Sequence, residues 1–200
     1  MKSIFKHPFL LLIKKPRMAI SIINKENSLL SASIITFLIV IGVGTYSSVF
    51  LPGKSFSVTI MIKHFIMLNL FFLFFSWAIY ITGKLLKGES NLRKIILSLY
   101  WANSVRLWLL LFSIPLFIAN FLNPEIIDKY FISNVIVADV WIGLAIALSI
   151  WSIVVFVIML SEIQRFSLLK SILNIIFGTI IVVLPIGILA GIIFMVDFSK

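Results

Sequence analysis

The sequence contains no cysteine and only two histidines, His7 and His64, among its 200 residues. Without cysteine there are no disulfides, no thiolate metal ligands and no cysteine nucleophile. Neither histidine has a second histidine or a carboxylate at metal-ligand spacing, and neither a Gly-x-Ser-x-Gly nor a His-Glu-x-x-His motif occurs. We therefore expect no catalytic residue, no cofactor and no metal, and we predict that the protein is not an enzyme.

Charged residues are also scarce, at 12% of the chain, whereas a soluble domain carries about a quarter. Five stretches of 18 to 27 residues contain no Asp, Glu, Lys or Arg. A helix needs about 20 mostly apolar residues to cross a hydrocarbon core of roughly 30 Å. The sequence predicts an all-α integral membrane bundle that forms one domain over 1–200. Its five transmembrane helices are expected at about 29–51, 65–83, 104–122, 138–160 and 171–196.

The first 28 residues form a basic segment before the first predicted span. From Pro16 onward the apolar residues recur with a helical period, and Pro16 suits the first helical position because its missing N–H needs no partner there. This pattern favours an amphipathic helix on the membrane surface, with a disordered basic tail as the alternative. The apolar run 9–13 is too short for the core of a cleavable signal peptide.

Positive charge is unevenly distributed between the two sides of the predicted bundle. With the N-terminus inside, 12 of the 17 Lys and Arg fall in cytoplasmic segments and four in outer ones. This bias predicts a cell-membrane protein with a cytoplasmic N-terminus and an external C-terminus. Basic residues beside spans contact anionic lipid headgroups, so lipids rather than nucleic acid are the expected partners. The candidate headgroup or partner contacts are Lys14, Lys15, Arg17, Arg106, Glu162 and Arg165.

The third span is the hardest to delimit, because Asn103, Ser104 and Arg106 interrupt the apolar stretch 95–122. One interpretation is a long tilted helix with Arg106 inside it. The other is a short interfacial helix to about Asn103, followed by a span from Ser104. We favour the second, since a central arginine costs at least about 2.5 kcal/mol on insertion scales. Arg106 is then a topology anchor that reaches the headgroups, and contact with a substrate carboxylate or a headgroup is the functional alternative.

Three further features suggest contacts between helices or with partners. Asn69, inside the second span, predicts an interhelical hydrogen bond, with a substrate contact as the alternative. Glu162 and Arg165 have the spacing of a helical ion pair, which is either a local pair or a docking point for a soluble partner. Gly187 and Gly191 form Gly-x-x-x-Gly, which allows close helix packing within the bundle or in a dimer.

Three segments share a pattern with a known family of membrane proteins. They are Lys15-Pro16-Arg17 with the helix that follows, the link from Gly83 through Lys87-Gly88-Glu89-Ser90, and the fourth-span exit with Trp151, Glu162, Phe166, Ser167 and Lys170. Together they resemble the bacterial form of the Yip family, the Ypt/Rab-interacting membrane proteins, over nearly the whole chain. The resemblance implies five spans and a cytoplasmic N-terminus. Eukaryotic Yip proteins bind prenylated Rab-type GTPases, a property that we do not extend to this chain.

These observations favour a non-enzymatic membrane protein of the Yip type that acts as an adaptor or membrane organiser with a basic cytoplasmic face. Another membrane protein or a second copy of the chain in a homo-oligomer is the further partner that we expect. The alternative is a small transporter or transporter subunit that acts as an oligomer, with Asn69, Pro185 and Gly187 as polar or movable elements. All seven carboxylates lie at span ends or in links, which argues against ion-coupled transport. A lipid-modifying enzyme would need carboxylates or histidines that converge at one membrane face.

Overall fold

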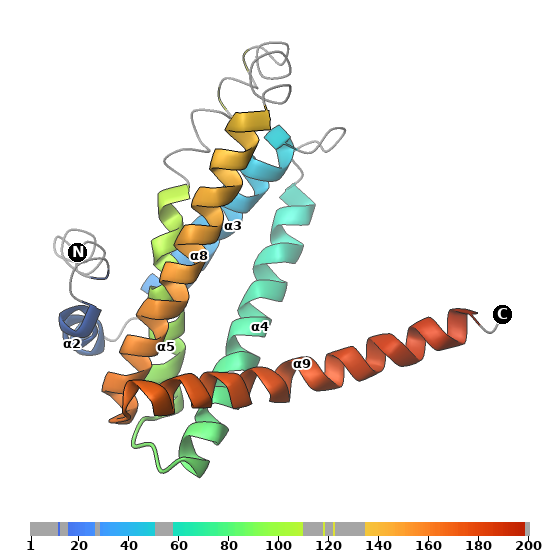
Figure 1. The fold of residues 1–200 in the computed structure, drawn as a ribbon. Coiled ribbons are helices and arrows are strands. Elements are labelled where there is room, and N and C mark those ends of the chain that lie inside the picture. Colours follow the sequence, from blue (N-terminus) through green and yellow to red (C-terminus); the bar gives the residue numbers. More distant parts are fainter. Residues whose placement is uncertain are drawn as a thin grey trace.

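The computed structural model of the chain describes residues 12, 16–26, 29–50, 58–109, 118, 122 and 135–198. Within these ranges the regular structure is entirely helical, which confirms the predicted all-α class there. The elements, shown in Figure 1, are α2 (Pro16–Glu26), α3 (Leu29–Phe50), α4 (Val58–Leu85), α5 (Leu92–Asn103), the 3-10 helix η1 (Ser104–Leu107), α8 (Val135–Gln164) and α9 (Leu168–Phe198).

The helices α3, α4, α5 and α8 run side by side, and α2 lies against α8 and α5 (Figure 1). The first half of α9 packs on α4 and α8, and its C-terminal half extends away from the bundle. The change comes after Val182, which is buried, because residues 183–188 are all exposed. α9 remains helical through Pro185, whose ring removes one backbone hydrogen bond.

Three of the described helices are long and apolar enough to cross a membrane: α4, the part Ile142–Gln164 of α8, and the part Leu168–Ile188 of α9. In α4 only 6% of the apolar window is buried inside the protein. Exposed side chains such as Leu70, Phe71 and Trp77 would be unfavourable in water and suit contact with lipid tails. The chain is therefore a membrane protein. The predicted first span coincides with α3, and most of the predicted third span lies outside the described residues.

The long helices extend beyond the predicted spans. α4 begins at Val58 and not at 65, so it includes Lys63 and His64. The His64 ring donates a 2.8 Å hydrogen bond from Nδ1 to the Ile60 carbonyl. α8 likewise continues past 160 to Gln164. Hydropathy delimits the part of a helix that lies in hydrocarbon, whereas polar residues in water continue the same helix without penalty.

α5 forms the centre of the bundle. Its residues Leu97, Leu99, Tyr100 and Trp101 are buried against α3, α4 and α8, and the Phe72 ring of α4 meets the Tyr100 ring edge-on at 5.1 Å. The predicted short helix to about Asn103 is therefore present, but it packs inside the bundle and does not lie on its surface. Nearly all side chains beyond the first turn are apolar, so the helix gains more by packing between its neighbours than by lying at the surface.

The chain stays helical beyond α5. α5 itself ends at Asn103, as predicted, but it passes directly into the tighter helix η1, and the chain remains helical to Leu109. The side chains of Asn103 and Ser104 bond back to the carbonyls of Leu99 and Trp101, at 2.9 and 2.6 Å, and so do not need water. This continuity favours the interpretation that places Arg106 inside a long helix.

Asn69 makes the interhelical bond that the sequence predicts. The Tyr100 hydroxyl of α5 donates a 2.7 Å hydrogen bond to Asn69 Oδ1, and Asn69 Nδ2 donates to the Phe65 carbonyl of its own helix. The amide is thereby satisfied on both sides, and it joins α4 to α5.

Replacing Tyr100 by phenylalanine is expected to lower the free energy of unfolding by about 0.6 kcal/mol, the average for such bonds in membranes. The measurement is denaturation by SDS in mixed micelles. Tyr80→Phe is the matched control, because the described residues offer the Tyr80 hydroxyl no hydrogen bond while Lys84 lies over its ring. An equal loss in both variants would show that the bond contributes nothing.

Candidate functional site

α4 ends in a turn that is fixed by its own backbone. The Gly88 N–H donates a 2.7 Å bond to the Gly83 carbonyl, and the Lys87 N–H donates a 3.0 Å bond to the Lys84 carbonyl. These are the two bonds of the Schellman motif, in which the residue after the helix adopts the left-handed conformation. Lys87 occupies that position with φ of 64°, where glycine is the common residue.

α8 ends in the same way. The Phe166 N–H donates a 2.9 Å bond to the Ser161 carbonyl, and Arg165 has φ of 55°. Both helices thus place a cation at the left-handed position, at a conformational cost of roughly 1–2 kcal/mol each. A positive charge at a helix C-terminus recovers part of that cost by its attraction to the helix dipole.

The helices that follow begin at the same end of the bundle. The Lys94 N–H donates a 3.0 Å bond to Asn91 Oδ1 at the start of α5, and the Lys170 N–H donates a 3.3 Å bond to Ser167 Oγ at the start of α9. Each cap satisfies an N–H that has no partner within its helix. The links 86–91 and 165–167 are therefore both short and well defined.

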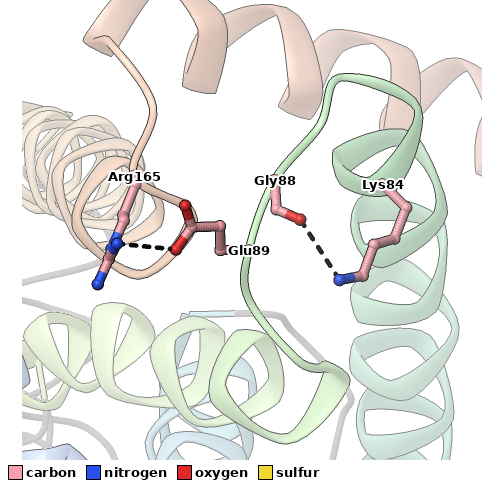
Figure 2. A network of polar contacts seen from close by, with 4 residues as sticks. All are labelled: Lys84, Gly88, Glu89 and Arg165. Carbon is pink, nitrogen blue, oxygen red and sulfur yellow. Dashed lines mark hydrogen bonds and ion pairs between the residues drawn. The ribbon is translucent and has the colours of Figure 1, made fainter.

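The two links are joined to each other, although about 75 positions separate them in the sequence. The Glu89 N–H donates a 3.4 Å bond to the Gln164 carbonyl, and Arg165 Nη1 lies 3.0 Å from Glu89 Oε2 (Figure 2). The predicted local pair between Glu162 and Arg165 is wrong. α8 ends at Gln164, and the left-handed turn at Arg165 directs the guanidinium to the other link.

Beneath the joined links, the Gln164 side chain is inserted between two glycines. A Cβ on Gly83 would lie 2.3 Å from Gln164 Nε2, and a Cβ on Gly88 would lie 2.0 Å from Gln164 Oε1. Thr82 donates a short hydrogen bond to Asn174 Oδ1 of α9. Within the described part of the chain, Gln164 Nε2 and Asn174 Nδ2 have no hydrogen-bond partner, although both residues are buried.

The outer surface of the joined links is strongly basic. We call it the basic face, and it comprises the exposed residues Lys84, Lys87, Arg93, Lys94, Arg165 and Lys170. Six cations and the two carboxylates beside them, Glu89 and Glu162, leave a net charge of +4. The Lys84 ammonium lies 5.6 Å from the Tyr80 ring centre and the Lys170 ammonium 5.3 Å from that of Phe166. Cations over aromatic rings at span ends are typical of a membrane–water interface.

The other predicted contact residues are dispersed. Lys14 and Lys15 lie outside the described residues, and Arg17 is exposed on α2. Arg106 is half-buried in η1, about 24 Å along the helical run from Asn91, so it is not part of the basic face. The buried Nε of Arg106 has no acceptor among the described residues.

Gly187 does not pack on another helix in the described structure, because a Cβ there would meet no atom within 4 Å. Gly191 is among the residues of α9 whose surroundings the structure does not describe. The close approach of α9 to α4 occurs instead at Gly178, where a Cβ would lie 2.5 Å from Ile79 Cδ1. The sequence prediction missed this contact, although Ser171, Asn174, Gly178 and Val182 form a helical stripe. Two of the four are small and one is a polar amide, which are residue types typical of helix interfaces in membranes.

The described residues contain no group of three or more His, Asp or Glu side chains placed to hold a metal ion. Comparisons of the chain with family models, curated proteins and solved structures find no match. The resemblance to the Yip family therefore stays a prediction. Function has to be inferred from the basic face and from the buried contacts that hold it together.

Proposed function

We propose that this chain is a non-enzymatic, multispanning membrane protein of the Yip type that acts as an adaptor or membrane organiser. Its basic face lies on the cytoplasmic side and contacts the anionic headgroups of the surrounding bilayer. The N-terminus is then cytoplasmic and α2 lies at the same interface. Another membrane protein or a second copy of the chain completes the assembly that it organises.

The observation that carries this proposal is the joining of two distant links into one surface with six exposed cations. Both links belong to the segments that the charge bias assigns to the cytoplasm. Each Lys or Arg near an anionic membrane surface is worth about 1 kcal/mol of attraction. A position of the face at headgroup level is supported by the bounds of the two membrane-capable segments, since one ends at Gln164 and the next begins at Leu168, on either side of Arg165.

Neutralising the basic face is expected to abolish selective retention of anionic lipid. In nanodiscs with equal phosphatidylglycerol and phosphatidylcholine, the wild-type protein should retain an excess of phosphatidylglycerol after gentle extraction, counted by native mass spectrometry. The variant with glutamine at Lys84, Lys87, Lys94 and Lys170 should lose most of that excess, since each cation contributes about five-fold at low salt.

The matched control carries arginine at the same four positions, which keeps the charge and should keep the excess of phosphatidylglycerol. Two results would contradict the proposal. One is a wild-type protein that retains the two lipids in the bulk ratio. The other is an arginine variant that loses the excess as fully as the glutamine variant does.

The second candidate function is a small transporter or transporter subunit. The observation in its favour is the pair of buried amide donors, Gln164 Nε2 and Asn174 Nδ2, which have no acceptor in the described structure. Both groups pack tightly on Gly83, however, so this conformation leaves no room for a solute between them. The adaptor function therefore agrees better with the geometry, and solute flux into liposomes would favour the transporter.

A further inference from the structure

Arg165 of the basic face is already bound to a carboxylate of its own chain. We propose that the phosphate of an anionic phospholipid binds Arg165 at the position where the Glu89 carboxylate now lies, so that Glu89 is an intramolecular competitor of the lipid. This inference rests on the proposed function. It adds a specific lipid site at Arg165 and a carboxylate, that of Glu89, which limits how much of that site the lipid occupies.

The geometry of the ion pair suits an exchange of acceptors. Arg165 Nη1 lies 3.0 Å from Glu89 Oε2, and the two side chains are 76% and 59% exposed. A guanidinium presents its N–H groups as a planar fork that fits the oxygens of a carboxylate and of a phosphate equally well. Exposed ion pairs are weak, so a phosphate that arrives at Arg165 can displace the carboxylate.

The backbone holds Arg165 ready for a ligand in either state. The Phe166 N–H bond to Ser161 fixes the turn, and the Glu89 N–H bond to the Gln164 carbonyl fixes the other link without using either charged side chain. Displacing the Glu89 carboxylate therefore leaves the joined links intact. Lys84 and Arg165 flank the Gly88–Glu89 segment on opposite sides (Figure 2), so other cations of the basic face lie close by.

The position of Arg165 favours a lipid over a soluble anion. The apolar part of α8 ends at Gln164 and that of α9 begins at Leu168, so Arg165 stands where two membrane-capable helices meet the interface. Headgroup phosphates are at their highest concentration at this level. The net charge of +4 on the surrounding surface selects a headgroup with a net negative charge, such as phosphatidylglycerol, over a zwitterionic one.

The test replaces each carboxylate of the basic face in turn. Glu162→Gln removes one negative charge from the same end, but the Glu162 carboxylate is not paired with Arg165, so it measures the general effect of one charge, about five-fold. Glu89→Gln should raise the retention of phosphatidylglycerol in the mixed nanodiscs by at least about two-fold more than that, because it also frees Arg165. Arg165→Gln should lower retention, and adding E89Q to R165Q should give only the gain that Glu162→Gln gives in the wild type.

The outcomes separate this inference from the function on which it rests. A wild-type protein without any excess of phosphatidylglycerol would overturn the proposed function. A wild-type excess with equal effects of E89Q and E162Q, or a gain from E89Q that is as large in the R165Q background as in the wild type, would overturn only the site at Arg165. Tight binding of a polyglutamate peptide to E89Q in phosphatidylcholine nanodiscs, with unchanged lipid retention, would assign the site to an acidic protein instead and would also overturn it.

Discussion

Replacing Gly88 by alanine is expected to lower the free energy of unfolding by about 1–3 kcal/mol, the usual cost of overpacking. The added methyl would lie 2.0 Å from Gln164 Oε1 and 2.8 Å from Phe166 Cζ, both of which must move. Gln164 is only 2% exposed, so its side chain has little space into which it can retreat. Gly88 lies outside the helices, so better helix propensity of alanine gives no compensation.

A second substitution at Gln164 makes this prediction specific. In the Gly88→Ala, Gln164→Ala double variant the Gln164 contact disappears, while the Phe166 contact stays, so the loss should be only partly reversed. The same suppressor should act more completely on Gly83→Ala, where the atoms nearest to the new methyl belong to Gln164 and to Asn174 Nδ2 at 3.2 Å. Gln164 Nε2 has no acceptor in the described structure, so the substitution breaks no hydrogen bond of that nitrogen and acts mainly through lost packing.

The measurement is the free energy of unfolding by SDS in mixed micelles, with Gly143→Ala as the control. A Cβ on Gly143 would meet nothing within 4 Å, so that variant should be at least as stable as the wild type. The tight packing of Gln164 between Gly83 and Gly88 would be refuted if Gly88→Ala were as stable as Gly143→Ala. Additive losses in the double variant would likewise show that the residues do not compete for one space.

The helices themselves were largely predictable, because the membrane imposes a strong rule on sequence. Long uncharged stretches predicted α3, α4, α8 and α9, and the 3.6-residue period with Pro16 predicted α2 from its first residue. The ends of α4 and α8 were not predictable from hydropathy. They are set by backbone motifs with Lys87 and Arg165 in the left-handed conformation, and cations give no sequence signal of that kind, whereas glycine does.

The candidate site was predicted only in part, since it depends on contacts between distant segments. The sequence indicated Arg165 as a contact residue and two basic links on one membrane side. It could not show that Glu89, about 75 positions away, takes the place of Glu162 as the partner of Arg165. The spacing of Glu162 and Arg165 predicts an ion pair only if both residues lie in the same helix. α8 ends at Gln164, so Arg165 lies outside it and the pair does not form.

The glycines of α9 show that a sequence motif and a close contact within the described structure need not coincide. Gly-x-x-x-Gly directs attention to Gly187 and Gly191, yet Gly187 faces open space in the described structure. Gly178 has no glycine four residues away and was not singled out, although it makes the close contact with Ile79 of α4. What a glycine does depends on the helix that lies opposite, and a single sequence does not contain that information.

Replacing Gly178 by alanine is therefore expected to destabilise the protein, whereas the same change at Gly187 is not. At Gly178 the methyl would lie 2.5 Å from Cδ1 of Ile79, a fully buried residue, and overpacking exceeds the helix propensity that alanine adds. The net loss should be about 1–2 kcal/mol. At Gly187 only the propensity term remains, so stability should stay the same or rise by up to about 1 kcal/mol.

Ile79→Val tests the cause of the loss, because it removes Cδ1 and keeps the rest of the side chain. Alone it should cost about 0.5–1.5 kcal/mol through the space that it leaves. Combined with Gly178→Ala it should restore stability toward that of the wild type, since the new methyl occupies the volume of the one removed. Equal effects of alanine at Gly178 and Gly187, or a double variant as unstable as the sum of its parts, would contradict the packing of α9 on α4. That packing brings Asn174 to Thr82 and holds the start of α9 beside the basic face, so the same variants test the support of the site.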